Sequence, residues 1–145
     1  MDKKLIVKKF EELTPVEVYE ILRSRATVFM VEQKIICVDP DRVDYDALHC
    51  FYMENGSVTA YLRAYAAGDV AKVGRVLTLV HGRGEGTRLM RESIPEIVKA
   101  FGCKKIAMSA QKHAEGFYAR LGFETVSEEY LEEGIPHVAM EMKIL

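Results

Sequence analysis

Apolar and polar residues alternate along several short stretches of the chain, a pattern typical of half-buried β-strands. It predicts strands at residues 5–10, 49–54, 57–67, 72–79, 105–110, 123–130 and 137–143. Asn55-Gly56 is a two-residue hairpin signal between the second and third of these strands. Glu133-Gly134 supplies the turn before the last strand.

Apolar residues at helical spacing predict three helices between these strands. Thr14-Pro15-Val16-Glu17 has the form of a capping box with proline at the first helical position, and the helix should reach about Met30. A second helix follows Gly86 and ends at Gly102, with Pro95 expected to kink it because proline removes a backbone hydrogen bond. Residues 113–121 form a short third helix.

The order of these elements, with strands early and β-α-β-α-β-β late, predicts an α/β fold with a mixed sheet. Residues 32–48 are acidic and irregular, so we expect a loop with one short helix at most. No repeat or long linker divides the chain, and residues 1–145 are expected to form one domain.

The composition narrows the class of protein. The chain has 145 residues, 49% of them hydrophobic and 29% charged, with a net charge of −2. Without a basic stripe to neutralise phosphates, nucleic-acid binding is not expected. No apolar run approaches the roughly 20 residues of a membrane span, and the first ten residues do not resemble a signal peptide. The three cysteines are scattered without a CxxC motif, which favours a reducing cytoplasm over a disulfide framework or zinc site.

The stretch HGRGEGTRLM, residues 81–90, places three glycines at alternate positions before a helix. A nucleotide-hydrolysing phosphate loop needs a lysine and then a hydroxyl residue after its last glycine, but Thr87-Arg88 follows Gly86 here. A dinucleotide fingerprint needs its third glycine at position 87, where this chain has a threonine. The stretch therefore matches neither motif. A third interpretation is a diphosphate cradle made of backbone amides at a helix N-terminus, with Arg83 and Arg88 adding charge at the rim. The alternative is a tight turn without a ligand.

Four segments in order resemble one family. Residues 75–90 resemble the acetyl-coenzyme A motif of the GNAT superfamily of N-acetyltransferases, and residues 110–123 resemble its second diagnostic segment. Residues 28–33 and 134–140 resemble the ElaA-like branch of small acetyltransferases. His81 stands where the family usually has Arg or Gln, and the turn before it is about two residues shorter than usual.

The resemblance implies a central twisted mixed sheet that splays between its fourth and fifth strands, with flanking helices. Acetyl-CoA would be the cosubstrate, with its pantetheine arm in the splay and its diphosphate at the glycine loop. No metal is implied. The expected cofactor-binding residues are Leu77, Thr78, Leu79, Gly82, Arg83, Gly84, Glu85, Gly86, Thr87 and Gln111.

The implied reaction is direct attack of a primary amine, on a small molecule or a peptide, on the thioester. A lysine-like amine with a pKa of about 10.4 needs about 4–5 kcal/mol to reach its free base at neutral pH, so a base must assist. Tyr118 stands where the family has its general acid, unless it is only a core tyrosine. For the base, Glu32 is the first candidate and His137 the second; either could instead be structural.

Other features leave alternatives open. Asp39, Asp41, Asp44 and Asp46 show no ligand spacing for a metal and are expected to be a solvated surface, which would favour a cationic amine if it faced the acceptor. A non-catalytic acyl-CoA sensor would share the fold and the glycine loop but would not need Tyr118 or an acceptor pocket. A homodimer could form through an exposed edge strand such as the last one.

Overall fold

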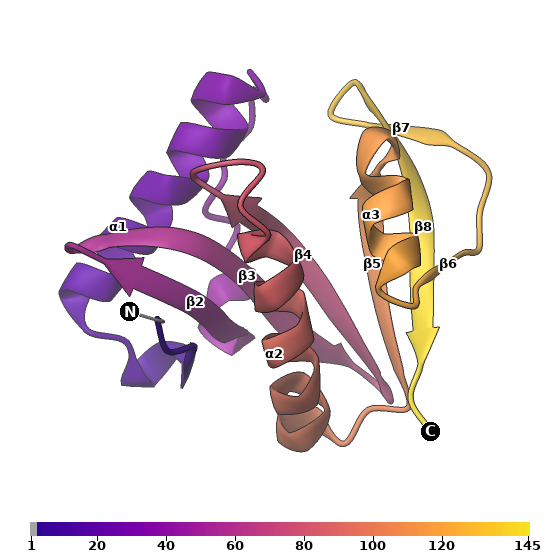
Figure 1. The fold of residues 1–145 in the computed structure, drawn as a ribbon, viewed down its shortest axis with the longest axis horizontal. Coiled ribbons are helices and arrows are strands. Elements are labelled where there is room, and N and C mark those ends of the chain that lie inside the picture. Colours follow the sequence, from indigo (N-terminus) through magenta and orange to yellow (C-terminus); the bar gives the residue numbers. More distant parts are fainter. Residues whose placement is uncertain (1–2) are drawn as a thin grey trace.

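The computed structural model describes residues 3–145, in which eight strands form one mixed sheet. The strand order is β1-β2-β3-β4-β5-β8-β6, and β7 pairs with β8 (Figure 1). The strands are β1 (Ile6–Lys9), β2 (Leu48–Glu54), β3 (Ser57–Ala67), β4 (Val70–Thr78), β5 (Lys105–Gln111), β6 (Glu124–Thr125), β7 (Tyr130–Glu132) and β8 (Ile135–Lys143). The pair β4–β5 is parallel and the other pairs are antiparallel, which confirms the predicted mixed sheet.

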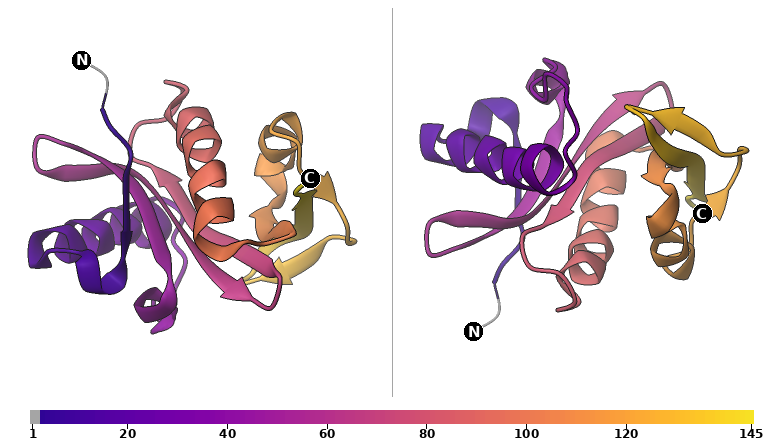
Figure 2. Two further views of the ribbon diagram at one scale, coloured as in Figure 1. Left: turned by 90° about the horizontal axis from the view of Figure 1, so that it is seen from below. Right: turned by 90° about the horizontal axis from the view of Figure 1, so that it is seen from above.

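Helices cover both faces of the sheet (Figure 2). They are α1 (Pro15–Arg25) with its π-helical continuation η2 (Ala26–Glu32), α2 (Glu85–Phe101) and α3 (Glu115–Arg120), with the short 3₁₀ turns η1 (Phe10–Glu12), η3 (Val43–Asp46) and η4 (Lys112–Ala114). The helix α1 packs on one face, over an apolar cluster that includes Ile21, Phe51 and Tyr61. The helices α2 and α3 pack on the other face, where the larger cluster lies.

The capping box predicted at the start of α1 is present. The hydroxyl of Thr14 accepts a hydrogen bond from the Glu17 N–H at 3.1 Å, and the Glu17 carboxylate accepts one from the Thr14 N–H at 2.8 Å. The helix continues as η2 to Glu32, two residues beyond the predicted end at Met30. The helix therefore carries Glu32 and Gln33 towards the end of β4, beside the glycine loop.

One predicted strand differs from the structure. The strand predicted at 123–130 is wrong in its middle, because the hydroxyl of Ser127 accepts the N–H of Ala139 at 2.9 Å and replaces the backbone partner there. The helix α2 continues through Pro95, with residues on both sides anchored in the core, and the kink expected at Pro95 stays a prediction. Leu89 and Ile97 are both fully buried.

The strands β4 and β5 separate after a short paired stretch, as the predicted splay requires. Only Val70–Val73 pairs with residues 105–108, after which the two strands diverge (Figure 1). Just beyond this point Arg75 has a φ of 53°, and the pairing with β3 jumps from Gly74 to Leu77, which marks a β-bulge. The backbone of residues 74–78 therefore has no strand partner on its β5 side.

The last strand, β8, is not an edge of the sheet. It pairs with β5 on one side and with β6 and β7 on the other, so the dimer contact expected through this strand has no open edge to use. No helix within residues 3–145 is both long and apolar enough to span a bilayer.

Candidate functional site

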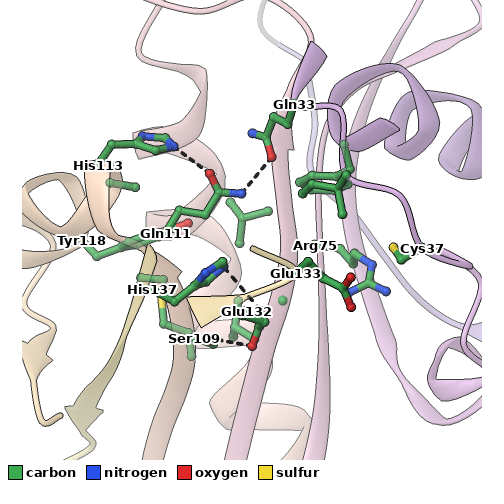
Figure 3. Close-up of a pocket in the computed structure, with 18 of the residues that line it drawn as sticks. Gln33, Cys37, Arg75, Ser109, Gln111, His113, Tyr118, Glu132, Glu133 and His137 are labelled. Atoms are coloured by element: carbon green, nitrogen blue, oxygen red, sulfur yellow. Dashed lines mark hydrogen bonds and ion pairs between the residues drawn. The ribbon is translucent and has the colours of Figure 1, made fainter. Parts of the chain in front are cut away.

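A cavity of about 410 Å³ lies where β4 and β5 diverge (Figure 3). Its walls come from five parts of the chain: the β4 bulge, the end of β5, the segment after η2, the start of α3 and the β7–β8 hairpin. The side chains that can do chemistry in it are Gln33, Cys37, Asp39, Arg75, Ser109, Gln111, His113, Tyr118, Glu132, Glu133 and His137. The site thus gathers residues from both ends of the sequence around the splay.

Tyr118 lines this cavity from α3. Its ring packs edge-on against Phe117, with centroids 5.0 Å apart, and against Phe123 at 6.1 Å, which leaves the residue 8% exposed. Burial raises the pKa of Tyr118 to about 12. Its hydroxyl has no hydrogen-bond partner within residues 3–145, so it is a protonated donor at neutral pH that is available to a group in the cavity.

His137 lies across the cavity at the start of β8 and is 6% exposed. Its Nδ1 is 2.7 Å from the carbonyl oxygen of Ile135, and its Nε2 is 3.4 Å from Oε2 of Glu132 (Figure 3). Because a carbonyl only accepts hydrogen bonds, Nδ1 is assigned the hydrogen. This leaves Nε2 as the nitrogen that can take up and release a proton.

Glu132 is held in place by β5. The Ser109 hydroxyl is 3.1 Å from Oε1 of Glu132 and also bonds the hydroxyl of Tyr130, whose ring stacks on His137 with an interplanar angle of 24°. No sequence motif points to Ser109 or Glu132, because their proximity to His137 depends on the β5–β8 pairing and the β7–β8 turn.

Glu32, the first candidate for the base, does not line the cavity. Its Oε1 is 3.2 Å from Nε2 of His81, and Nδ1 of His81 is 3.4 Å from the hydroxyl of Thr78. The three side chains lie at the exposed end of β4 beside the glycine loop. The structure therefore brings Tyr118 and His137 into one cavity and leaves Glu32 outside it.

Gln111 spans the opening of the splay. Its amide nitrogen donates to Oε1 of Gln33 at 2.8 Å, and its amide oxygen lies 2.7 Å from Nε2 of His113 (Figure 3). Gln33 thus belongs to the site although it was not a predicted site residue. Its signal was present in the VEQ segment that marks the ElaA-like branch.

The glycine loop presents backbone rather than side chains. Gly82 and Gly84 have φ of 80° and 72°, and a Cβ on either would meet nothing within 4 Å, so backbone conformation is what requires glycine there. Gly84 caps α2 without a side-chain hydrogen bond, which leaves the first N–H groups of the helix open. Gly86 is different: it has no positive φ, and a Cβ there would lie 3.4 Å from the Phe117 ring, which is ordinary van der Waals contact.

The other expected cofactor-binding residues differ in what their side chains do. Leu77 is buried under α1, and the N–H of Leu79 donates to the carbonyl of Thr59 at 2.8 Å. Glu85 forms an ion pair with Lys3 at 2.5 Å. The Arg88 guanidinium lies over the Tyr52 ring at 4.8 Å, whereas Arg83 and Thr87 lie at the loop, Arg83 exposed and Thr87 half-buried.

The acidic loop is an ion-pair network rather than the expected solvated surface. Asp39 is 5% exposed and accepts hydrogen bonds from Arg25 and Arg75, each at 2.8 Å. The expectation is wrong for Asp39 and Asp44, which are buried and half-buried. Asp41 is exposed but paired with Arg63, and Asp46 is exposed without such a partner in the described chain. The arginines come from α1, β3 and β4, and sequence spacing does not show that they converge.

Two of these carboxylates are strongly held in the charged state. Arg63 binds Asp41 with both terminal nitrogens at 2.7 Å and lowers its pKa to about 2. Burial alone would raise the pKa of Asp44, but hydrogen bonds from Arg25 and Arg63 hold it below its ordinary value. These aspartates are neutralised by arginine. Across residues 3–145, no group of three or more His, Cys, Asp or Glu side chains is arranged to hold a metal ion.

Comparisons with known proteins agree with this geometry. The model of the family described as "Acetyltransferase (GNAT) domain" matches residues 41–144. Escherichia coli ElaA is 32% identical over 141 residues, with 92% of each chain covered, and its crystal structure superposes with a TM-score of 0.91. A UPF0039 protein of Schizosaccharomyces pombe is 33% identical, with 96% of each chain covered. An acyl-CoA N-acyltransferase from Pseudomonas aeruginosa is 33% identical, with a TM-score of 0.90 over 96% of this chain and 99% of its own.

Proposed function

The chain belongs to the GNAT acetyltransferase family, in its ElaA-like branch, and we propose that it transfers an acetyl group from acetyl-CoA to a primary amine. Membership of the family supports acyl transfer from an acyl-CoA in general. The observation that carries the amine chemistry is the placement of the unpartnered Tyr118 hydroxyl and of Nε2 of His137 in one cavity.

The residues of the splay fit an acyl-CoA. The unpaired backbone of residues 74–78 offers amide and carbonyl groups to the amides of a pantetheine arm, much as a sheet edge offers them to an added strand. The open N–H groups after Gly84 suit a diphosphate, and Gln111 lies at the opening between the two. We propose that Leu77, Thr78 and Leu79 contribute through their backbone, and that residues 82–87 form the diphosphate loop.

In the proposed reaction the amine first gives a proton to Nε2 of His137. The amine nitrogen then forms a bond to the thioester carbon and gives its second proton to solvent. The carbon–sulfur bond breaks, and the departing thiolate takes the Tyr118 hydroxyl hydrogen. Tyr118 recovers a hydrogen from solvent, and His137 releases its proton. No enzyme side chain is acylated. Glu32 remains the alternative base, but its contact with His81 places it outside the cavity, where it would need a water relay.

The experiment that tests this function is coenzyme A release from acetyl-CoA with a panel of small amines and lysine-containing peptides. Release that depends on an amine and falls strongly in Tyr118→Phe is the expected result. Calorimetry with coenzyme A provides the control, because both proteins should bind it equally. Tight binding of acetyl-CoA without release for any amine would instead favour the non-catalytic sensor.

A further inference from the structure

We infer that Glu132 receives the acceptor amine as a cation, and that the ammonium group binds between this carboxylate and Nε2 of His137. The inference rests on the proposed function and adds the substrate class to it: amines that are protonated in solution. It assigns the acceptor side of the cavity to the β7–β8 hairpin rather than to the acidic loop.

The Glu132 carboxylate is fixed and accessible at once. One oxygen is held 3.1 Å from the Ser109 hydroxyl, while the other faces His137, 3.4 Å from its Nε2. The side chain is 51% exposed, so a ligand can reach it without any rearrangement of the hairpin. Ser109 is itself held by the Tyr130 hydroxyl, and Tyr130 and His137 are register partners across the β7–β8 pair.

The contact between Glu132 and His137 lacks a hydrogen when the imidazole is neutral. Since Nδ1 carries the ring hydrogen for the Ile135 carbonyl, neutral His137 presents a lone pair at Nε2 to the carboxylate oxygen. Two acceptors that face each other at this distance repel. An ammonium group has three donors and satisfies both acceptors together, one N–H to Glu132 and one to Nε2.

The same arrangement explains the next step. When the proton moves from the ammonium nitrogen to Nε2, the amine becomes the nucleophile and the imidazolium is left beside the Glu132 carboxylate, which stabilises it. Glu132 does not itself take the proton. It therefore binds the substrate cation before the transfer and the His137 cation after it.

The other two carboxylates of the cavity lining, Asp39 and Glu133, are less suited to this role. Asp39 is paired with Arg25 and Arg75. Glu133 lines the cavity at the hairpin turn, but no hydrogen bond or ion pair in the described chain holds its carboxylate in one position, whereas Ser109 holds that of Glu132. The Tyr118 hydroxyl, which has no hydrogen-bond partner in residues 3–145, belongs to the lining of the same cavity and is left for a ligand there.

The test compares two acceptors of similar size, an alkylamine that is cationic at pH 7.5 and an alkoxyamine that is neutral there. In Glu132→Gln we expect the KM of the alkylamine to rise about 10- to 100-fold, as for the loss of a charged hydrogen bond. The KM of the alkoxyamine should change less than about threefold. Glu128→Gln is the matched control: it removes the same charge from an exposed residue near the hairpin that does not line the cavity, and it should leave both values unchanged.

The outcomes separate the inference from the proposed function. Equal effects of Glu132→Gln on both acceptors, or no effect on either, would overturn the inference while amine-dependent release still supports the function. No release by the wild-type protein with any amine would overturn both. Glu132→Asp and Ser109→Ala provide second variants: each should raise the KM of the alkylamine selectively, and melting curves will show that the fold is kept.

Discussion

Replacement of Tyr118 by phenylalanine removes one oxygen atom and should separate catalysis from binding and folding. The ring contacts with Phe117 and Phe123 remain, so the packing of α3 is kept. The lost hydroxyl has no partner in residues 3–145, and its removal breaks no protein hydrogen bond. We therefore expect the free energy of unfolding to change by less than about 1 kcal/mol.

The expected loss of turnover is much larger. Positioned general acids contribute about 100- to 10,000-fold, and kcat of Tyr118→Phe should fall within that range. Because burial raises the pKa of Tyr118 to about 12, only about one molecule in 10,000 is ionised at pH 8, so this tyrosine should cause no loss of rate up to that pH. Thiol release measured from pH 6 to 9 tests both points.

The affinity for coenzyme A should be unchanged in this variant, as measured by calorimetry. Tyr45→Phe is a suitable control. Tyr45 is exposed, packs beside Phe10 and does not line the cavity, so this variant removes a tyrosine hydroxyl outside the site. A Tyr118→Phe protein that turns over within threefold of the wild type would remove Tyr118 from the mechanism. A fall in coenzyme A affinity that accounts for the whole loss would do the same.

Three further predictions concern the structure that supports the site. Gly84→Ala should destabilise the protein by about 1–2 kcal/mol in urea denaturation because φ is 72° there, whereas Gly74→Ala, without positive φ, should cost less. Arg25→Ala should cost about 3–5 kcal/mol, since it removes a fully buried partner of Asp44; a cost below 1 kcal/mol would contradict the network. The low pKa of Asp41 in the folded state means that protonation favours unfolding, so the free energy of unfolding should fall as the pH drops from about 4 to 2, and fall less in Asp41→Asn.

Local signals were enough to predict most of the fold. The capping box at Thr14, the Asn55-Gly56 hairpin and the alternation in 57–67 each depend on neighbours in sequence, and each appears in the structure. The failure at 126–129 has a different cause, because the hydroxyl of Ser127 takes a hydrogen bond from Ala139 twelve residues away. Sequence alternation carries no information about such a side-chain partner.

The candidate site could be predicted only in part. The glycine loop and Tyr118 lie in contiguous motifs, and the structure places Tyr118 in the cavity of the splay. Glu132 became visible only when strand pairing brought it to His137. The prediction of a solvated surface is wrong for Asp39 and Asp44, because arginines from separate elements converge on them and neutralise their charge.

The short seam between β4 and β5 has a mechanical consequence. Within residues 3–145, backbone pairing joins the two halves of the sheet along four residue pairs at one corner, and the Gln111 side chain is hydrogen-bonded to Gln33 across the open end. A small rotation about this corner would change the separation of β4 and β5 most at their open end. A molecule that lies between β4 and β5 and bonds to both strands would oppose this rotation and hold the two halves of the sheet at one separation.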